Sequence, residues 1–366
     1  MPNDQAVPSS LHDYLAAGRS GISERLRRIA ASRMETLAAV HGDGRRLMER
    51  ILDFSLRGKL IRGSLVCMGH DLFRPAAAGA VREALWDAAA AMELVQSGLL
   101  VHDDIMDQDG VRRGAPTIHS LYGREAAAEG ALDPAHVGEA LGLCAGDACF
   151  FLAFEVLSRC QAPAAVRARI LERVAGVLTA VSLAQMQDVR WGAEDREVPE
   201  GEVLSMYRWK TARYSFSVPL ACGALLAEAP EAQVAALEEI GEHVGIAFQL
   251  RDDELGLFGD ESEIGKPVGS DIREGKKTVL RARLLAAAPP GERERLRRLF
   301  GGDPGPGDIA HVRDLAESLG VRKAVEDLAA ARLSLARQRI DCLSGLQPGM
   351  APMLSDLADF MCRRNA

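Results

Sequence analysis

Aromatic residues are scarce in this 366-residue sequence, at 5% of the total. Because aromatic side chains are enriched in strands, this scarcity argues against a β-sandwich or an aromatic-rich barrel. An excess of basic residues is also missing, since 44 Lys and Arg stand against 52 Asp and Glu, giving a net charge of -8. Nucleic-acid-binding proteins usually carry a basic field, so the charge balance argues against that class.

The seven cysteines include no CxxC pair, which excludes a zinc ribbon and disfavours a disulfide framework. Buried free thiols in a reducing cytoplasm are therefore expected. The N-terminus has no basic start followed by an apolar run, so no signal peptide is expected. The most apolar long window, residues 140–157, carries Asp147 and Glu155, which favours a buried helix over a membrane span.

Ala and Leu recur with a spacing near 3.6 residues along most of the chain, which predicts an all-α fold. We expect one helical domain over residues 1–366, with residues 1–20 loosely ordered. Breaks are expected at Pro289–Gly291 and at Gly301–Gly307. The predicted helices cover residues 22–40, 45–55, 60–72, 79–107, 136–158, 164–190, 201–210, 232–257, 275–287, 308–317, 321–342 and 350–362.

The first chemical signal is the segment LVHDDIMDQDGVRRG, at the end of the helix predicted over 79–107. Asp103 and Asp107 are four residues apart and project from one helical face, with Asp104 beside them. Carboxylates so close repel one another unless cations occupy the site, and Mg²⁺ prefers such oxygen ligands. The alternative is a solvated acidic helix end. The same face continues upstream through Met92, Gln96 and Leu99, which favours a cavity over bulk water.

A second acidic helix end follows in FQLRDDELG, where Asp252 and Asp253 close another apolar helical run. Each acidic end is followed by basic residues, which can hold phosphate oxygens or, alternatively, neutralise the local carboxylates. This pairing suits a polyphosphate bound through Mg²⁺. The basic residues concerned are Arg112, Arg113, Lys266, Lys276 and Lys277, and further cations stand at Lys59, Arg62 and Lys210.

These segments resemble the motifs of the trans-type polyprenyl diphosphate synthases, which include farnesyl and geranylgeranyl diphosphate synthases. The motifs stand in the family's order: GKLIR (58–62), DDIMD (103–107), RRG (112–114), GD (146–147), QMQD (185–188), KT (210–211), FQLRDD (248–253) and GKPVGSD (265–271). The resemblance implies an all-α bundle around a deep central cavity, usually in a homodimer. It also implies two substrates, isopentenyl diphosphate and an allylic diphosphate, and three Mg²⁺ ions per site.

The resemblance assigns roles to single residues, each through the motif that contains it. Asp103, Asp107 and Asp252 would be catalytic Mg²⁺ ligands, and Asp104 and Asp253 would ligate or orient. The other roles are allylic diphosphate binding by Arg112, Lys210, Thr211, Gln249 and Lys266; isopentenyl diphosphate binding by Lys59, Arg62, Gln96 and Arg113; and contact with the carbocation side by Gln185 and Asp188. The family's second acidic motif normally ends in a third Asp, where this sequence has Gly256.

The implied reaction joins the two substrates: the allylic diphosphate ionises, and the double bond of isopentenyl diphosphate attacks the resulting carbocation. No GxSxG, HExxH or Walker A motif points to another chemistry. Two alternatives stay open at this point. A class I terpene cyclase would also carry a DDxxD motif but would not need a second diphosphate pocket, and a non-catalytic subunit of a heteromeric prenyl synthase commonly loses an acidic motif.

Product length in this family depends on residues one and two turns before the first acidic motif. Farnesyl-producing members, and many that stop at C20, have an aromatic residue four or five positions before it, where this sequence has Leu99 and Gly98. With Val95 and Met92 deeper on the same helix, we expect geranylgeranyl diphosphate (C20), with C25 or longer as the alternative and C15 less favoured. The competing interpretation is that Gly98 only allows a neighbouring helix to pack closely.

Overall fold

The computed structural model describes residues 10–75, 77–259 and 269–363, and these residues are almost entirely helical. The predicted all-α class is confirmed. The described residues divide into two compact units, and each is treated by itself below. Unit 1 comprises Met1–Glu172, Pro219–Val234 and Gly345–Met353, and unit 2 comprises Arg173–Val218, Ala235–Ser344 and Leu354–Ala366. The organisation of the chain as one domain stays a prediction.

The first helix begins earlier than expected. Helix α1 covers Leu11–Val40, so the expectation that residues 11–20 are loosely ordered is wrong, while residues 1–9 lie outside the described residues. Ser10 caps α1 by accepting a hydrogen bond from the Asp13 backbone N–H over 3.2 Å. A buried stripe then begins at Tyr14, whose hydroxyl donates to Asp71 over 2.8 Å. The Ser10 cap and the buried stripe that begins at Tyr14 therefore stabilise a helix from residue 11 onward.

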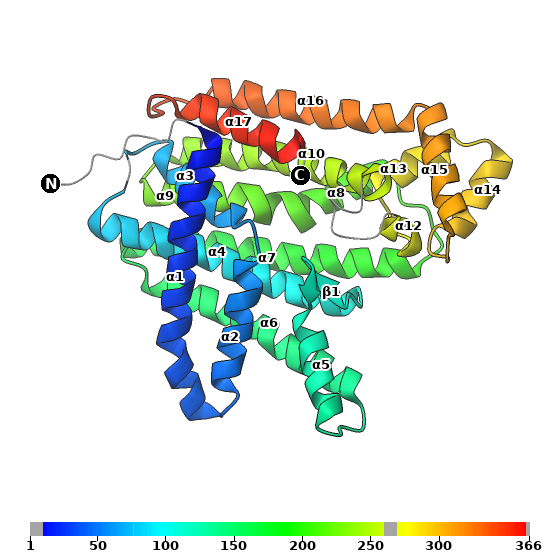
Figure 1. The fold of residues 1–366 in the computed structure, drawn as a ribbon. Helices are drawn as coiled ribbons and strands as arrows, with labels where there is room; N and C mark the ends of the chain where they lie inside the picture. The colour runs from blue at the N-terminus through cyan, green and yellow to red at the C-terminus, as the bar shows by residue number, and fades with distance from the viewer. Residues whose placement is uncertain (1–9, 76, 260–268, 364–366) are drawn as a thin grey trace. The chain divides into compact units, whose positions relative to one another are not determined.

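Unit 1 is organised around α4, Gly79–Met106, which contacts α1, α2 (Gly44–Leu56), α3 (Ile61–Asp71), α5 (Ile118–Ala128) and α6 (Pro134–Arg159). Helices α1 and α2 lie side by side (Figure 1). An Ala-rich stretch in the middle of α4, including Ala88–Ala91, is fully buried. Such small side chains let several helices approach α4, and the acidic motif then follows at the C-terminal end of this rigid helix.

Helix α6 contains the apolar window that was expected to be a buried helix. Among the described residues, two helices, α4 and α6, are long and apolar enough to span a membrane by length and composition alone, which is weak evidence for a span. The apolar window of α4 is 83% buried, whereas that of α6 is only 39% buried. The helix is therefore confirmed, but the expectation that it is buried is wrong for much of its surface.

Unit 1 also contains most of α9 (Val218–Leu226). Unit 2 contains the other described helices. They are part of α7 (Ala164–Ala193), α8 (Glu200–Tyr207), η1 (Arg208–Ser217), most of α10 (Glu231–Phe258), α12 (Ser270–Arg273), α13 (Val279–Ala287), α14 (Pro290–Leu299), α15 (Pro306–Ser318), α16 (Val321–Asp341) and most of α17 (Met350–Arg363). A core that includes Tyr207, Leu250 and Leu284 joins α8, α10 and α13. The break predicted at Pro289–Gly291 begins α14, because proline is tolerated in the first turn of a helix.

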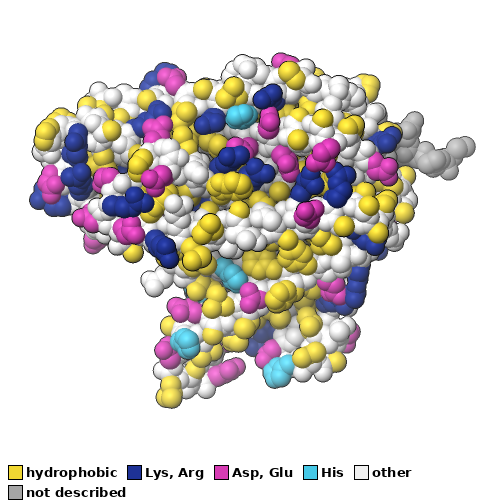
Figure 2. All heavy atoms as spheres, turned by 180° about the vertical axis from the view of Figure 1, so that it is seen from behind, with side chains coloured by type: hydrophobic (Ala, Val, Ile, Leu, Met, Phe, Trp, Pro, Cys, Tyr) yellow, Lys and Arg dark blue, Asp and Glu magenta, His cyan; other side chains and the backbone are white. Residues whose placement is uncertain are grey.

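Charged side chains of both signs are intermixed on the face of the molecule shown in Figure 2, with patches of hydrophobic side chains between them. No large area of a single sign is visible on that face. This mixture agrees with the slightly acidic composition and offers no basic stripe there for a nucleic acid.

Candidate active site

The first acidic motif lies where α4 ends. Asp103 and Asp104 are in its last turn and Asp107 is its C-cap residue, with the Asp107 N–H donating to the Asp103 carbonyl over 2.8 Å. The side chain of Asp104 is 1% exposed, whereas that of Asp103 is 25% exposed. Neighbouring aspartates of one motif therefore point to different environments, and only Asp103 and Asp107 of the three keep access to solvent.

Arg112 binds the buried member of this motif. Its Nε donates to Asp104, and its terminal nitrogen lies 3.2 Å from Asp109 and 3.8 Å from Asp103. Burial raises the pKa of Asp104 to about 6, and the charge of Arg112 opposes this rise. Of the two roles open to Asp104, its burial and its ion pair favour orientation over direct ligation of a metal. For Arg112, the contacts are those of the alternative interpretation, neutralisation of local carboxylates.

The two arginines of the RRG motif lie in a short β-hairpin, Arg112 at the end of its first strand and Arg113 in its turn. Strand β1, Val111–Arg112, pairs antiparallel with β2, Ala115–Pro116, and the turn residues Arg113 and Gly114 have φ of 54° and 71°. Two positive φ values in sequence match the turn that suits the twist of paired strands. Sequence analysis missed this hairpin, because its strands are too short to show an alternating pattern. As a result, Arg112 and Arg113 point to different partners.

Arg113 lies beside the GKLIR segment. A Cβ built at Gly58 would lie 2.9 Å from Arg113 Nη1, so the guanidinium occupies the space that a larger residue would fill. Lys59 is exposed, and Leu60 precedes α3 with a φ of 52°, a left-handed conformation that few residues other than glycine adopt. The structure thus brings Arg113 to the predicted isopentenyl diphosphate residues.

Glu93 is a buried carboxylate under this cationic group, and no motif predicted it. Its Oε1 accepts a hydrogen bond from the Gly63 N–H, in the first turn of α3, over 2.7 Å. Burial raises the pKa of Glu93, while the charges of Arg62 and Arg113 lower it. One turn further along α4, Gln96 is 7% exposed and its Oε1 has no hydrogen-bond partner within the described ranges. Glu93 therefore links α3 and α4 beneath the predicted pocket.

The four residues predicted to set product length have different surroundings on α4. Met92 and Val95 are fully buried, and Leu99 is half-buried. A Cβ at Gly98 would lie 2.9 Å from both the Gly146 carbonyl oxygen and the Phe150 ring of α6. Gly98 is thus a point of close contact between α4 and α6, which agrees with the interpretation that this glycine allows a neighbouring helix to pack closely.

The second acidic motif lies in the last two turns of α10, in unit 2. Asp252 is exposed, whereas both oxygens of Asp253 are bound by protein. The Tyr207 hydroxyl donates to one, and Gln249 Nε2 donates to the other over 2.7 Å. Burial, and next the charge of Asp271, raise the pKa of Asp253 well above its usual range. The second aspartate of each motif therefore faces inward.

The hydrogen-bond chain continues to the predicted KT motif. Thr211 Oγ1 donates to Gln249 Oε1 over 2.9 Å, and the Tyr207 hydroxyl accepts from the Val279 N–H over 3.1 Å. Lys210 binds Asp188 of α7, joining the residue predicted beside the carbocation to the KT motif. Gln185 lies one turn earlier on α7. Within unit 2, the structure thus connects Asp188, Lys210, Thr211, Gln249 and Asp253.

Lys210 and Thr211 belong to η1, a ten-residue π-helix. Such helices are rare and often mark functional sites. Its close neighbour is α10: a Cβ at Gly245 would lie 2.4 Å from Ala212 Cα, and one at Gly241 would lie 2.6 Å from Ser217 Cα. Because Gly241, Gly245, Gln249 and Asp253 are four residues apart, one face of α10 follows η1 and α8 along its length.

The position of the missing third aspartate faces another carboxylate. The Gly269 N–H donates to the Gly256 carbonyl over 3.1 Å, and a Cβ at Gly256 would lie 3.1 Å from Asp271 Oδ2. An aspartate at position 256 would therefore stand beside Asp271. Lys266 lies outside the described residues.

The donor atoms fit a metal that is shared with a substrate. Within residues 10–75, 77–259 and 269–363, no group of three or more His, Cys, Asp or Glu could hold a metal ion alone. Mg²⁺ commonly takes one or two carboxylates and completes its shell with water and substrate phosphates. Asp103 and Asp107 in unit 1, and Asp252 in unit 2, offer such partial oxygen sets.

Comparisons with known proteins agree with this chemistry. The sequence model of the polyprenyl synthetase family matches residues 45–319. A geranylgeranyl diphosphate synthase of Sulfolobus acidocaldarius is 37% identical over 68% of this chain and 69% of its own length. A (2E,6E)-farnesyl diphosphate synthase of Mycobacterium bovis is 35% identical over 84% of this chain and 80% of its own length.

A solved structure is similar over nearly the whole chain. The geranylgeranyl pyrophosphate synthase of Corynebacterium glutamicum, in complex with isoprenyl diphosphate and magnesium, has a TM-score of 0.88 and 31% identity. The match covers 95% of this chain and 98% of that one.

The contact between α10 and η1 predicts a cost for any side chain at position 245. Gly245→Ala should lower the free energy of unfolding by about 1–3 kcal/mol, because the new methyl group must displace Ala212. Gly176→Ala is the control, since a Cβ there has no neighbour within 4 Å and alanine favours a helix by roughly 1 kcal/mol. Denaturant unfolding measures both. Equal stability of the two variants would contradict the close contact.

Proposed function

The chain belongs to the polyprenyl synthetase family and is a trans-prenyl diphosphate synthase; on this premise we propose that it extends an allylic diphosphate with isopentenyl diphosphate to geranylgeranyl diphosphate. The observation that carries this proposal is the divergence of Arg112 and Arg113. One side chain lies on the acidic motif, and the other lies beside Gly58 and Lys59. Two separate cationic groups suit two diphosphates.

Mg²⁺, on which the family depends, would supply positive charge that makes the allylic diphosphate a leaving group. Asp103, Asp107 and Asp252 would hold it, with three ions per site as the proposed number. Asp104 and Asp253 would orient their motifs from the protein side, because Arg112, Tyr207 and Gln249 already occupy their oxygens.

The protein's own side chains position charge and do not form a covalent bond to substrate. Lys210 and Thr211, held by Asp188 and Gln249, would bind the allylic diphosphate together with Arg112 and Lys266. The fixed donors would stabilise the departing diphosphate. Lys59, Arg62, Gln96 and Arg113 would hold isopentenyl diphosphate so that its double bond faces the reacting carbon. Gln185 and Asp188 would face the carbocation.

Two alternatives are less well supported. A terpene cyclase does not need a second diphosphate pocket, whereas here Glu93 is buried beneath Arg62 and Arg113 and ties their elements together. A non-catalytic subunit commonly loses an acidic motif, whereas Asp253 is held by two donors beside Asp252.

The purified chain alone should convert isopentenyl diphosphate and an allylic primer to a linear prenyl diphosphate in the presence of Mg²⁺. Asp103→Ala should abolish turnover nearly completely while the protein stays folded, because it removes a metal ligand and leaves the buried Asp104–Arg112 ion pair in place. Radiolabelled isopentenyl diphosphate followed by chromatography measures the product, and circular dichroism checks the fold. A cyclic product from the allylic substrate alone would favour a cyclase, and inactivity of the folded chain would favour a partner subunit.

Product length is the finer part of the proposal. Relatives bear names of both C20 and C15 synthases. The C20 proposal is supported by Leu99 and Gly98, which replace the aromatic residue of shorter-product members, and C25 or longer is the alternative. Gly98 is packed against α6, so we propose that the neighbouring Leu99 is the position from which a larger side chain would shorten the product.

Leu99→Phe should shift products from C20 toward C15 with turnover largely retained. A phenyl ring one turn before Asp103 would shorten the space for the growing chain. The distribution of chain lengths, measured after dephosphorylation, tests this. Leu99→Met is the matched control and should leave the distribution nearly unchanged. A folded Leu99→Phe variant with the unaltered spectrum would show that Leu99 does not line the path of the chain.

We also propose a homodimer and a cytoplasmic location. Helix α6 leaves Leu141, Leu143 and Phe151 exposed, the last at 71%, and such an apolar face is typical of a surface that a partner covers. A second copy of this chain is the proposed partner. All seven cysteines are free thiols, which supports a reducing compartment, although the expectation that they are buried is wrong for Cys144 and Cys342, which are exposed.

Phe151→Glu should convert the dimer to a monomer, because a carboxylate would have to be buried in the apolar interface. Leu132→Glu is the control, since Leu132 is fully exposed in the loop before α6. Light scattering after size-exclusion chromatography gives the mass of each. The dimer proposal fails when the wild type elutes as a monomer, and this interface fails when Phe151→Glu remains dimeric.

A further inference from the structure

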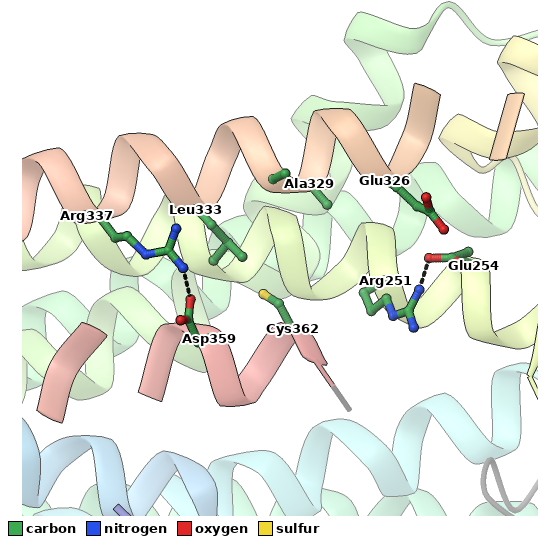
Figure 3. Close-up of a pocket in the computed structure, with 9 residues that line it drawn as sticks. Arg251, Glu254, Glu326, Ala329, Leu333, Arg337, Asp359 and Cys362 are labelled. Atoms are coloured by element: carbon green, nitrogen blue, oxygen red, sulfur yellow. Dashed lines mark hydrogen bonds and ion pairs between the residues drawn. The ribbon is translucent and has the colours of Figure 1, made fainter. Parts of the chain in front are cut away.

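A third acidic residue follows the second motif directly, and it is buried. The side chain of Glu254 is 2% exposed, although it comes immediately after Asp252 and Asp253 on α10. It is bound by two arginines: Arg251 of the same helix, as Figure 3 shows, and Arg322, whose Nε lies 3.0 Å from Glu254 Oε1. Glu254 is therefore enclosed between two arginines.

Arg322 is the second residue of α16 and has several partners there. It also pairs with Glu317 over 2.6 Å, and its guanidinium lies 4.4 Å from the ring centre of Phe258, the last residue of α10. A neighbouring arginine from α15, Arg313, donates to the Leu257 carbonyl. Two arginines from outside α10 thus hold its final turn, one through side chains and one through the backbone.

Repulsion between carboxylates explains why the C-terminal turns of α10 need nearby arginines. Asp252, Asp253 and Glu254 are three consecutive carboxylic acids in the last two turns of a helix. Carboxylates repel one another there, and the unpaired carbonyls at a helix C-terminus add further negative potential. Nearby cations offset this repulsion. Without them the last turns of α10 would fray or turn, and the direction of Asp252 would no longer be fixed.

We propose that Arg322 and Glu254 are positioning residues for the second acidic motif. Their ion pair anchors the rear of α10 to α16, so that Asp252 on the opposite side keeps the orientation required for Mg²⁺ and a diphosphate. This inference rests on the proposed function. Neither residue touches substrate or metal: Glu254 is enclosed, and Arg322 acts only through it. Partners that orient metal ligands typically change metal affinity about 10- to 100-fold when removed.

Arg337, which lies on α16 like Arg322, provides a matched control. Arg251, Glu254 and Arg337 line a cavity of ≈ 370 Å³ between α10, α16 and α17. At its other end, Arg337 pairs with Asp359 and so joins α16 to α17 (Figure 3). Arg337→Ala therefore also breaks an ion pair of α16 beside the same cavity, but one that does not involve the acidic end of α10.

The experiment compares Arg322→Ala with Arg337→Ala in the full-length chain. Thermal unfolding is followed with EDTA and with Mg²⁺ plus inorganic diphosphate, and turnover is measured over a range of Mg²⁺ concentrations. Arg322→Ala should need about tenfold more Mg²⁺ for half-maximal turnover, with kcat recovered at saturating Mg²⁺. Its stabilisation by Mg²⁺ and diphosphate should require correspondingly more metal. Arg337→Ala should match the wild type in both measurements.

The outcomes separate the two proposals. When wild-type protein gains no stability from Mg²⁺ with diphosphate and has no activity, the proposed function fails. When the wild type responds but Arg322→Ala has the Mg²⁺ requirement of Arg337→Ala, the positioning role is overturned. Arg322→Met serves where the alanine variant does not fold, because it keeps packing against Phe258 and removes the charge; an unchanged Mg²⁺ requirement there also overturns the proposal.

Discussion

The close contact between α10 and the π-helix η1 is the constraint on which the second half of the site depends. Glycine at positions 241 and 245 brings the two backbones together. Once that distance is set, the next two residues on the same face, Gln249 and Asp253, meet Thr211 and Tyr207. A shift of one helical turn would break both hydrogen bonds. Packing of small residues thus fixes the position of polar ones, as expected where helices touch without intervening side chains.

In both acidic motifs, two adjacent aspartates have different roles: the second is bound by other side chains of the protein, and the first is more exposed. The second aspartate of each is held by protein donors, Asp104 by Arg112 and Asp253 by Tyr207 and Gln249. A carboxylate bound in this way is costly to move, so it fixes the rotation of its helix end. Asp103 and Asp107 keep access to solvent, and Asp252 is exposed. Local order in this site therefore comes from residues beside the presumed ligands.

Helical spacing explains what the sequence could predict and what it could not. Long helices and the two acidic ends follow from periodicity and from the charge pattern, whereas the proximity of Arg113 to the GKLIR segment was implied by the family resemblance. The RRG hairpin and the π-helix have no periodic signal, since one is too short and the other is continuous with α8. Glu93 and Tyr207 act across the fold, so only tertiary contacts reveal them. The role of Gly98 was ambiguous in the sequence, because a glycine can either leave space for the growing chain or allow a neighbouring helix to pack closely.

Charge at helix C-termini connects stability to function in this protein. Placing acidic clusters where α4 and α10 end adds side-chain repulsion to the unfavourable end of each helix dipole. Arginines of the protein itself offset that cost: Arg112 at α4, and Arg313 and Arg322 at α10. In the proposed reaction, a Mg²⁺–diphosphate complex would relieve the same repulsion. The arginines that offset the repulsion at each acidic helix end therefore also fix the position of the carboxylates there, because each ion pair or hydrogen bond ties the helix end to another part of the chain.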